Sequence, residues 1–216
     1  MLLCLCLRWV EAGGRLRLWP IESEQPMDTS HVADTEVQDR YRRIADGFEQ
    51  RLTTLSPNQQ NLPTPCTDWD VAALVAHVIS THRRIGAQAG GPAASDPDPN
   101  GDLELQWREA SALIAEVLGD PIRAQATVGG MFGEQTFESL VSRLLCADTL
   151  YHTWDLARAS AQDDHLDEDA CEKALRFLEP LDEAIRRPGG FAARISPPPG
   201  ADVQTRFLNF GGRAAD

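Results

Sequence analysis

Residues 137–157 read FESLVSRLLCADTLYHTWDLA and form the longest helical pattern in the chain. Within them, Val141, Leu145 and Leu156 recur at the spacing of a buried helix face. Asp148 and His152 lie on this same face, one helical turn apart. Burying a carboxylate beside an imidazole costs several kcal/mol unless a hydrogen-bonded partner or a bound cation compensates for it. The stretch therefore predicts a core helix that carries a candidate functional site.

Other periodic segments predict further helices around this one. We expect helices at about 34–55, 69–87, 102–118, 137–160 and 167–187. Asp34 is expected to cap the first helix, and Thr67 with Asp70 resembles a capping box before the second. The glycine-containing segment 122–136 predicts a short hairpin or an extended loop, and no helix is predicted in the proline-rich tail after Pro197. The fold class is therefore all-α, a four-helix bundle with an additional C-terminal helix.

The composition sets limits on partners. The 216 residues suit one domain, and the formal net charge of −13 argues against nucleic acid or an anionic membrane as the main partner. The apolar run at the start, MLLCLCLRWV, is too short to span a bilayer. We expect residues 1–30 to be an N-terminal extension outside the fold, and residues 31–216 to form the domain.

The cysteines do not predict a disulfide framework. Their number is five, which is odd, and none forms a CxxC pair. Cys66, Cys146 and Cys171 are interpreted as scattered reduced thiols, and Cys146 is not expected to be a metal ligand. Reduced thiols are typical of the cytoplasm, which is the expected location.

A metal site built from Asp148 and His152 needs a further ligand from a facing helix. The second predicted helix offers His77 and His82. Periodicity slightly favours His82, which continues an apolar stripe, whereas His77 lies within a continuous apolar run and is expected to be buried. His82 adjoins two arginines and is expected to be partly exposed. The residues alone leave both histidines open as the third ligand.

Two motifs resemble a known family. Residues 64–78, TPCTDWDVAALVAHV, are similar to the TPCxxWxVxxLxxHV signature of the N-terminal metal-binding domain of mycothiol-dependent maleylpyruvate isomerases. Residues 147–159, ADTLYHTWDLARA, resemble the D/E-x3-H-x-WDLARA motif of the same family, which belongs to the DinB-like superfamily. The resemblance covers about residues 36–213, and the C-terminal part is similar to a stand-alone actinobacterial subgroup described as metal-binding.

The resemblance implies a ligand set of His77, Asp148 and His152. It implies a divalent metal, with zinc expected and nickel, iron or manganese as alternatives, and mycothiol as the thiol cosubstrate. The sequence departs from the isomerase, which commonly has glutamate where this chain has Asp148 and which carries a separate C-terminal domain that contributes to its substrate site. We therefore expect a thiol-dependent transferase or isomerase that acts on an electrophile other than maleylpyruvate.

Several alternatives stand beside this hypothesis. Asp148 and His152 could form a structural hydrogen bond, or Asp148 could pair with Arg143. Asp155 could orient a metal ligand from the second shell or bond the backbone near the helix end. The protein could be a non-catalytic metal- or thiol-sensing module, or a non-haem iron oxygenase. Trp69 and Trp154 are interpreted as packing residues, and a homodimer is one oligomeric state to test.

Overall fold

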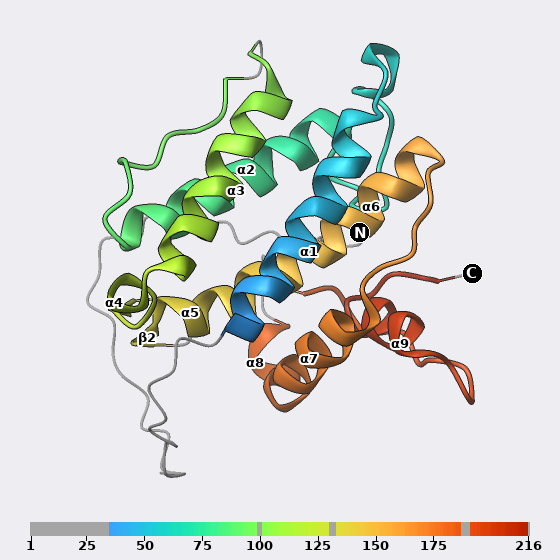
Figure 1. The fold of residues 1–216 in the computed structure, drawn as a ribbon. Helices are drawn as coiled ribbons and strands as arrows, with labels where there is room; N and C mark the ends of the chain where they lie inside the picture. Colours follow the sequence, from blue (N-terminus) through green and yellow to red (C-terminus); the bar gives the residue numbers. More distant parts are fainter. Residues whose placement is uncertain (1–34, 99–100, 130–132, 187–190, 216) are drawn as a thin grey trace, which may run out of the picture.

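The computed structural model describes residues 35–98, 101–129, 133–186 and 191–215, so the expected extension at 1–30 lies outside the described residues. Four long helices form a bundle (Figure 1): α1 (Thr35–Thr53), α2 (Val71–Gln88), α3 (Leu103–Gly119) and α6 (Cys146–Ser160). Each packs against two others, in the order α1, α3, α2, α6 and back to α1, so the ring of helices closes. The all-α prediction is confirmed.

Shorter elements connect and extend the bundle. The helical ones are α4 (Pro121–Ala124), α5 (Phe137–Leu140), α7 (Glu168–Leu178), α8 (Asp182–Ile185) and α9 (Val203–Phe210), with 3-10 turns at Pro57–Gln59 and Glu179–Leu181. The predicted hairpin is confirmed: β1 (Thr127–Val128) pairs antiparallel with β2 (Gln135–Thr136), which leads into α5. None of the helices in the described parts of the chain is long and apolar enough to cross a membrane.

The predicted fourth helix contains a π-helical turn. This turn, Val141–Leu145, separates α5 from α6, and the amide of Cys146 donates to the carbonyl of Val141, five residues back. Arg40 of α1 donates a hydrogen bond of 2.6 Å to the hydroxyl of Ser142 within the turn. A π-helical turn holds more residues than an α-helical one, so it changes which side of the helix the following residues face. It therefore helps set the direction of Asp148, which follows shortly after.

The helix caps only partly match the predictions. The cap of α2 is Asp70, whose carboxylate accepts from the amide of Ala73, so the prediction of Thr67 as the cap is wrong. An aspartate can bond the free amides of the first turn by itself and needs no partner upstream. Asp34 lies outside the described residues. The loop before α2 is fixed because Thr64 and Cys66 bond the backbone around Trp69.

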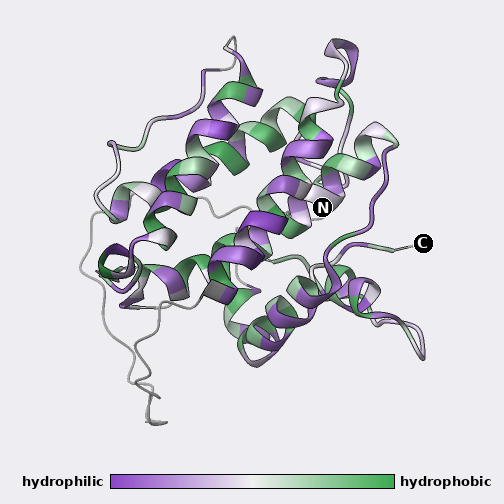
Figure 2. Cartoon of the chain, in the orientation of Figure 1, coloured by the Kyte–Doolittle hydropathy of each residue, from purple (hydrophilic) through white to green (hydrophobic). Residues whose placement is uncertain are grey.

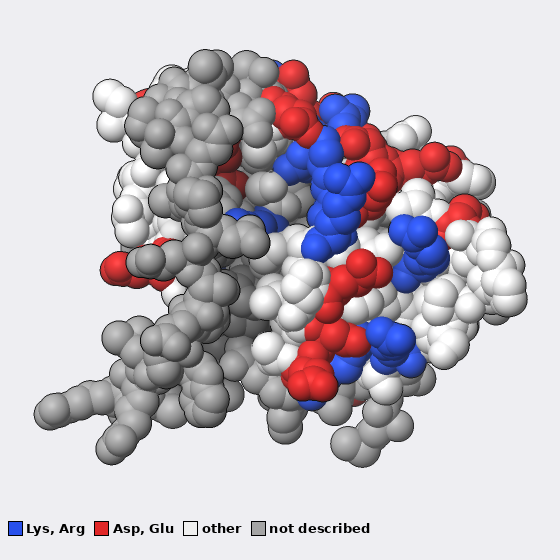
Figure 3. Space-filling model, turned by 90° about the horizontal axis from the view of Figure 1, so that it is seen from below, with Lys and Arg blue, Asp and Glu red and all other residues white. Residues whose placement is uncertain are grey.

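The core lies between the bundle helices. The predicted stripe of α1 is buried and consists of Val37, Tyr41, Ile44, Phe48 and Leu52. Figure 2 shows hydrophobic and hydrophilic residues alternating along the long helices, as expected for helices with one buried side. Figure 3 shows Lys and Arg interleaved with Asp and Glu on one face of the molecule. Among the ion pairs, Arg43 of α1 contacts Asp167 at 2.6 Å.

Helix α9 corrects the expectation for the tail. Asp202 caps it by accepting from the amide of Thr205, and its apolar side packs on α7. The ring of Phe207 stacks on Tyr151 of α6 at 4.0 Å, and the Tyr151 hydroxyl donates to the carbonyl of Phe207 at 2.7 Å. The prolines before α9 made a helix in this segment difficult to predict from the sequence. The burial of α9 depends on contacts with residues that are distant in the sequence.

Candidate metal centre

The structure brings His77, Asp148 and His152 together between two neighbouring helices. Asp148 and His152 are completely buried on α6, and Nε2 of His152 lies 3.6 Å from Oδ1 of Asp148. Nε2 of His77, on α2, lies 3.5 Å from the same oxygen. One potential ligand atom from each residue lies within 4.8 Å of the other two. The three residues therefore form a cluster of potential metal ligands.

Asp148 and His152 have polar atoms without ordinary partners, whereas Nε2 of His77 lies 3.5 Å from the hydroxyl of Thr81. Among the described residues, both carboxylate oxygens of Asp148 and Nε2 of His152 are buried without a hydrogen bond. Such atoms are costly to bury, and most buried polar atoms in proteins are hydrogen-bonded. Ligand atoms around a tetrahedral zinc ion lie about 3.4 Å apart, given metal–ligand distances of about 2.1 Å. The measured separations of 3.5 and 3.6 Å fit a cation better than direct hydrogen bonds.

The charges of the cluster are strongly coupled. Burial alone would raise the pKa of Asp148, but the two histidines hold it well below its usual range. Burial lowers the pKa of His77, and the charge of Asp148 only partly offsets this effect. For His152, the opposing effect of burial is exceeded by the negative charges of Asp148 and Asp155 and by the hydrogen bond to Asp155, which raise its pKa. A cation can take the place of a proton beside this buried carboxylate, because metal binding releases protons from the ligands.

Asp155 lies against the far nitrogen of His152. Its Oδ2 accepts from Nδ1 of His152 at 3.1 Å, which places the proton of a neutral ring on Nδ1 and the lone pair of Nε2 toward Asp148. Of the two roles considered for Asp155, this geometry favours orientation of the histidine over backbone bonding at the helix end. The carboxylate is itself held by Arg213, through contacts of 2.7 and 3.1 Å.

The two histidines of α2 have different environments. His77 joins the cluster, and only 9% of its side chain is exposed, close to the burial expected for it. His82 is completely buried, so its predicted partial exposure is wrong. Its Nδ1 donates to the carbonyl of Val78 at 2.8 Å, its ring lies 4.7 Å from Trp107, and burial lowers its pKa to about 4. The structure thus brings His77, and not His82, to Asp148 and His152.

Trp69 forms an aromatic wall beside the cluster. Its ring centroid lies 4.4 Å from that of His77 and 5.6 Å from that of His152, while the two imidazoles are 5.1 Å apart. These contacts restrict the rotation of both rings, so the packing role expected for Trp69 acts directly on the cluster. His77 is the residue of the cluster that retains contact with solvent, which places the opening of the site on the α2 side.

One structural alternative is excluded by geometry. Arg143 does not neutralise Asp148, because it is exposed and its guanidinium lies over the ring of Phe177 at 5.4 Å.

The cysteines divide into two kinds. Cys146 and Cys171 are free and buried, and burial raises the pKa of each thiol to about 12. Cys66 takes part in a disulfide, so its interpretation as a reduced thiol is wrong. Disulfide formation depends on proximity in space, which the sequence spacing does not reveal. The Cys66 sulfur also lies within 4.8 Å of a ligand atom of both His152 and Asp155.

A helical bundle with two histidines and a carboxylate converging from neighbouring helices has the architecture of a DinB-like metal-binding domain. Residues 41–157 match the family described as mycothiol maleylpyruvate isomerase N-terminal domain, and the chain belongs to that family. It is 30% identical over 173 residues to uncharacterized protein MT0763 of Mycobacterium tuberculosis strain CDC 1551 / Oshkosh, covering 78% of this chain and 94% of that protein. Uncharacterized protein Rv0738 of strain ATCC 25618 / H37Rv matches to the same extent. No solved structure matches the chain significantly.

Proposed function

We propose that the protein binds a divalent metal, zinc in the first place, through His77, Asp148 and His152, and that the site activates mycothiol for transfer to an electrophile or for isomerisation. The observation that carries the proposal is the convergence of three potential ligand atoms. Those of Asp148 and His152 are buried and have no hydrogen-bond partner among the described residues. Two neutral nitrogens and one carboxylate suit zinc with one position left for a further ligand.

Each residue has a defined task in this proposal. His77 and His152 offer the lone pairs of Nε2, and Asp148 supplies a negative charge in a buried environment. Asp155 keeps the proton of His152 on Nδ1, away from the cluster. Trp69 restricts the two imidazoles to one arrangement. The metal, when bound, would act as a Lewis acid that lowers the pKa of the thiol cosubstrate.

The proposed reaction needs a thiolate and an electrophilic carbon. The thiol gives its proton to solvent, and its sulfur forms a bond to the carbon. In a transfer, the leaving group departs from this carbon with its electron pair and takes up a proton from solvent, so the carbon–sulfur bond remains. In an isomerisation, the thiolate adds to a conjugated carbon–carbon double bond, whose π electrons move onto the activating carbonyl. Rotation about the resulting single bond follows, and the carbon–sulfur bond then breaks, which restores the double bond and returns the thiolate. The thiol cosubstrate reacts only in its reduced form, and this requirement, rather than the cysteines of the chain, is why we propose the cytoplasm as the location.

Metal analysis of protein purified without an affinity tag tests the first part of the proposal. We expect about one divalent ion per chain in the wild type and none in His152→Ala, with helicity retained in both. His82→Gln is the matched control, because His82 lies on the same helix as His77 but belongs to none of the groups of potential ligands among the described residues. A wild-type protein that binds none of zinc, nickel, iron or manganese would refute the proposed site.

Titration of the cobalt-substituted protein with mycothiol tests the second part. A new sulfur-to-cobalt absorption band is expected, and an unchanged spectrum at saturating thiol would refute direct coordination of the thiol. A panel of electrophiles then separates an enzyme from a non-catalytic metal- or thiol-sensing module. The module would bind the metal and the thiol but consume none of the electrophiles.

A further inference from the structure

Arg213 is a buried arginine at the candidate metal centre, and it comes from the end of the chain. Its side chain is 6% exposed, and its guanidinium forms a two-point contact with the carboxylate of Asp155, Nη2 to Oδ2 at 2.7 Å and Nε to Oδ1 at 3.1 Å. Nη1 donates to the carbonyl of Gly211 at 3.0 Å. The region that matches the family ends at residue 157, so Arg213 belongs to a part of the chain beyond it.

The segment that carries Arg213 is firmly seated on α6. The guanidinium lies over the ring of Tyr151 at 4.7 Å, and the side-chain amide of Asn209 donates to the carbonyl of Arg213 at 2.9 Å. A side chain at Gly211 would collide with the Tyr151 ring, and Gly212 has a φ of +79°, which favours glycine. These contacts fix the position of the arginine backbone, so the guanidinium approaches Asp155 from one direction.

We infer that Arg213 is a positioning residue for the metal centre. It fixes Asp155 so that this carboxylate accepts from Nδ1 of His152 and the lone pair of Nε2 faces the metal position. The inference rests on the proposed function and extends it to a residue that touches none of the three candidate ligands.

The shape of the guanidinium supports this role. Two parallel N–H groups against two carboxylate oxygens prevent rotation of the carboxylate, which one point charge would not do. Asp155 therefore has a defined oxygen, Oδ2, for His152. Without Arg213, a buried carboxylate would lose its compensating charge and would be free to turn away from the imidazole. Removing a group that orients a metal ligand in this way typically lowers the metal affinity about 10- to 100-fold.

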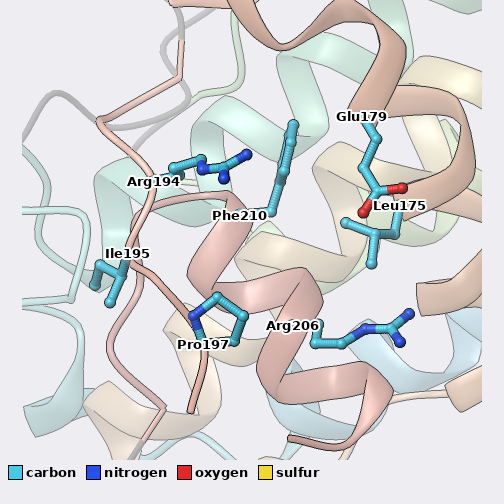
Figure 4. Close-up of a pocket in the computed structure, with 7 residues that line it drawn as sticks. All are labelled: Leu175, Glu179, Arg194, Ile195, Pro197, Arg206 and Phe210. Atoms are coloured by element: carbon cyan, nitrogen blue, oxygen red, sulfur yellow. The ribbon is translucent and has the colours of Figure 1, made fainter. Parts of the chain in front are cut away.

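A matched control is Arg186, which follows α8 and contacts the helix that precedes Arg213. Arg186 donates to the carbonyl of Phe210 at 2.9 Å and lies over the Phe210 ring at 4.9 Å, so it also holds α9 in place but does not contact Asp155. Figure 4 shows Phe210 on α9, beside the pocket that α9 forms with α7 and the chain near Arg194. Loss of Arg186 therefore reports the effect of a loosened α9 alone.

The experiment measures zinc affinity by competition with a chromophoric chelator for Arg213→Met, Arg213→Lys and Arg186→Met. We expect at least tenfold weaker binding for Arg213→Met, an intermediate loss for Arg213→Lys, and a change within twofold for Arg186→Met. In zinc-free protein, nitrogen NMR at a pH where His152 is neutral should show the Nδ1–H tautomer alone in the wild type and Arg186→Met, and a mixture of tautomers in Arg213→Met.

Equal zinc affinities for Arg213→Met and Arg186→Met, or an unchanged tautomer in Arg213→Met, would overturn the inference. Arg213→Lys keeps a buried positive charge and gives the same two readouts if Arg213→Met does not fold. The tautomer measurement needs no metal. It therefore tests the inference even if the wild type fails to bind zinc, an outcome that would refute the proposed function alone.

Discussion

Replacing the buried His82 should make the protein more resistant to mild acid. Burial lowers the pKa of His82 from 6.5 to about 4 in the folded state, whereas the unfolded chain keeps the ordinary value. Between these two pH values the unfolded state binds the additional proton, so stability falls as the pH falls. At about 1.4 kcal/mol per pH unit, the protein loses about 3 kcal/mol of its free energy of unfolding through His82 on going from pH 6.5 to pH 4.

The variant to test this is His82→Gln. Glutamine does not titrate, and its amide can still donate to the carbonyl of Val78, as His82 does. The variant is expected to be less stable than the wild type at pH 7, because glutamine fills the space beside Trp107 less well. The difference in the free energy of unfolding between wild type and variant should therefore shift by about 3 kcal/mol in favour of the variant between pH 7 and pH 4.

Urea unfolding at half-unit pH steps from 4 to 7 provides the measurement. The other titrating groups are common to both proteins, so the difference between the two free energies of unfolding isolates His82. His165→Gln is the control, because His165 is 86% exposed and its loss should leave the acid sensitivity in place. A difference between wild type and His82→Gln that stays constant within about 0.5 kcal/mol over this range would refute the reasoning. His82→Gln should also bind zinc as the wild type does, because His82 lies outside the cluster.

Three further predictions concern the metal and the packing. Zinc at a hundredfold excess over its dissociation constant should stabilise the folded protein by about 2.7 kcal/mol in thermal unfolding, and Asp148→Asn should abolish this gain; an equal gain in the variant would contradict the ligand assignment. Leu145→Ala, at a completely buried position, should lower the free energy of unfolding by about 3 kcal/mol, whereas Leu105→Ala, at a position 51% exposed, should cost less than about 1 kcal/mol. Asp70→Ala removes the cap of α2 and should cost about 1 kcal/mol in urea unfolding, and no measurable loss would show that the cap is dispensable.

Periodicity was sufficient to find the long helices, because their burial follows from the local pattern. The predicted stripe of α1 is buried, and Asp148 and His152 lie inside the protein, as their spacing on the apolar face required. The predicted helix boundaries agree less well with the structure. The predicted helix at 167–187 is divided into α7, a 3-10 turn and α8, with Pro180 inside the turn. Proline lacks the amide that an α-helix interior needs, which accounts for the interruption.

The choice between the two histidines of α2 depended on packing partners that spacing does not contain. His82 faces Tyr41 of α1 and Trp107 of α3, whereas His77 faces α6 and Trp69. Both faces of α2 are covered, because this helix contacts α3 on one side and α6 on another. A helix that is apolar on most sides gives no periodic signal for which histidine meets which neighbour.

The π-helical turn and the role of Arg213 were not predictable for a similar reason. The turn consists of residues that also suit an α-helix, and it is defined by one backbone bond from Cys146 to Val141. Arg213 reaches Asp155 across 58 residues of chain, through a short helix that needs Tyr151 to hold it. Contacts between residues so far apart in the sequence are set by tertiary packing. No local sequence pattern indicates that an arginine near the end of the chain is buried.

The candidate ligands lie on α2 and α6, which are separated along the chain by α3 and the β1–β2 hairpin. A cation held by both helices would tie the two ends of this intervening stretch together in the folded protein, so that opening the stretch would require release of the ion. Helix α3 contributes no ligand, yet it lies within this stretch and packs against α2. Its backbone amides should therefore exchange more slowly with deuterated solvent when the cation is bound, so that loading of the site can be read from a helix that does not touch it.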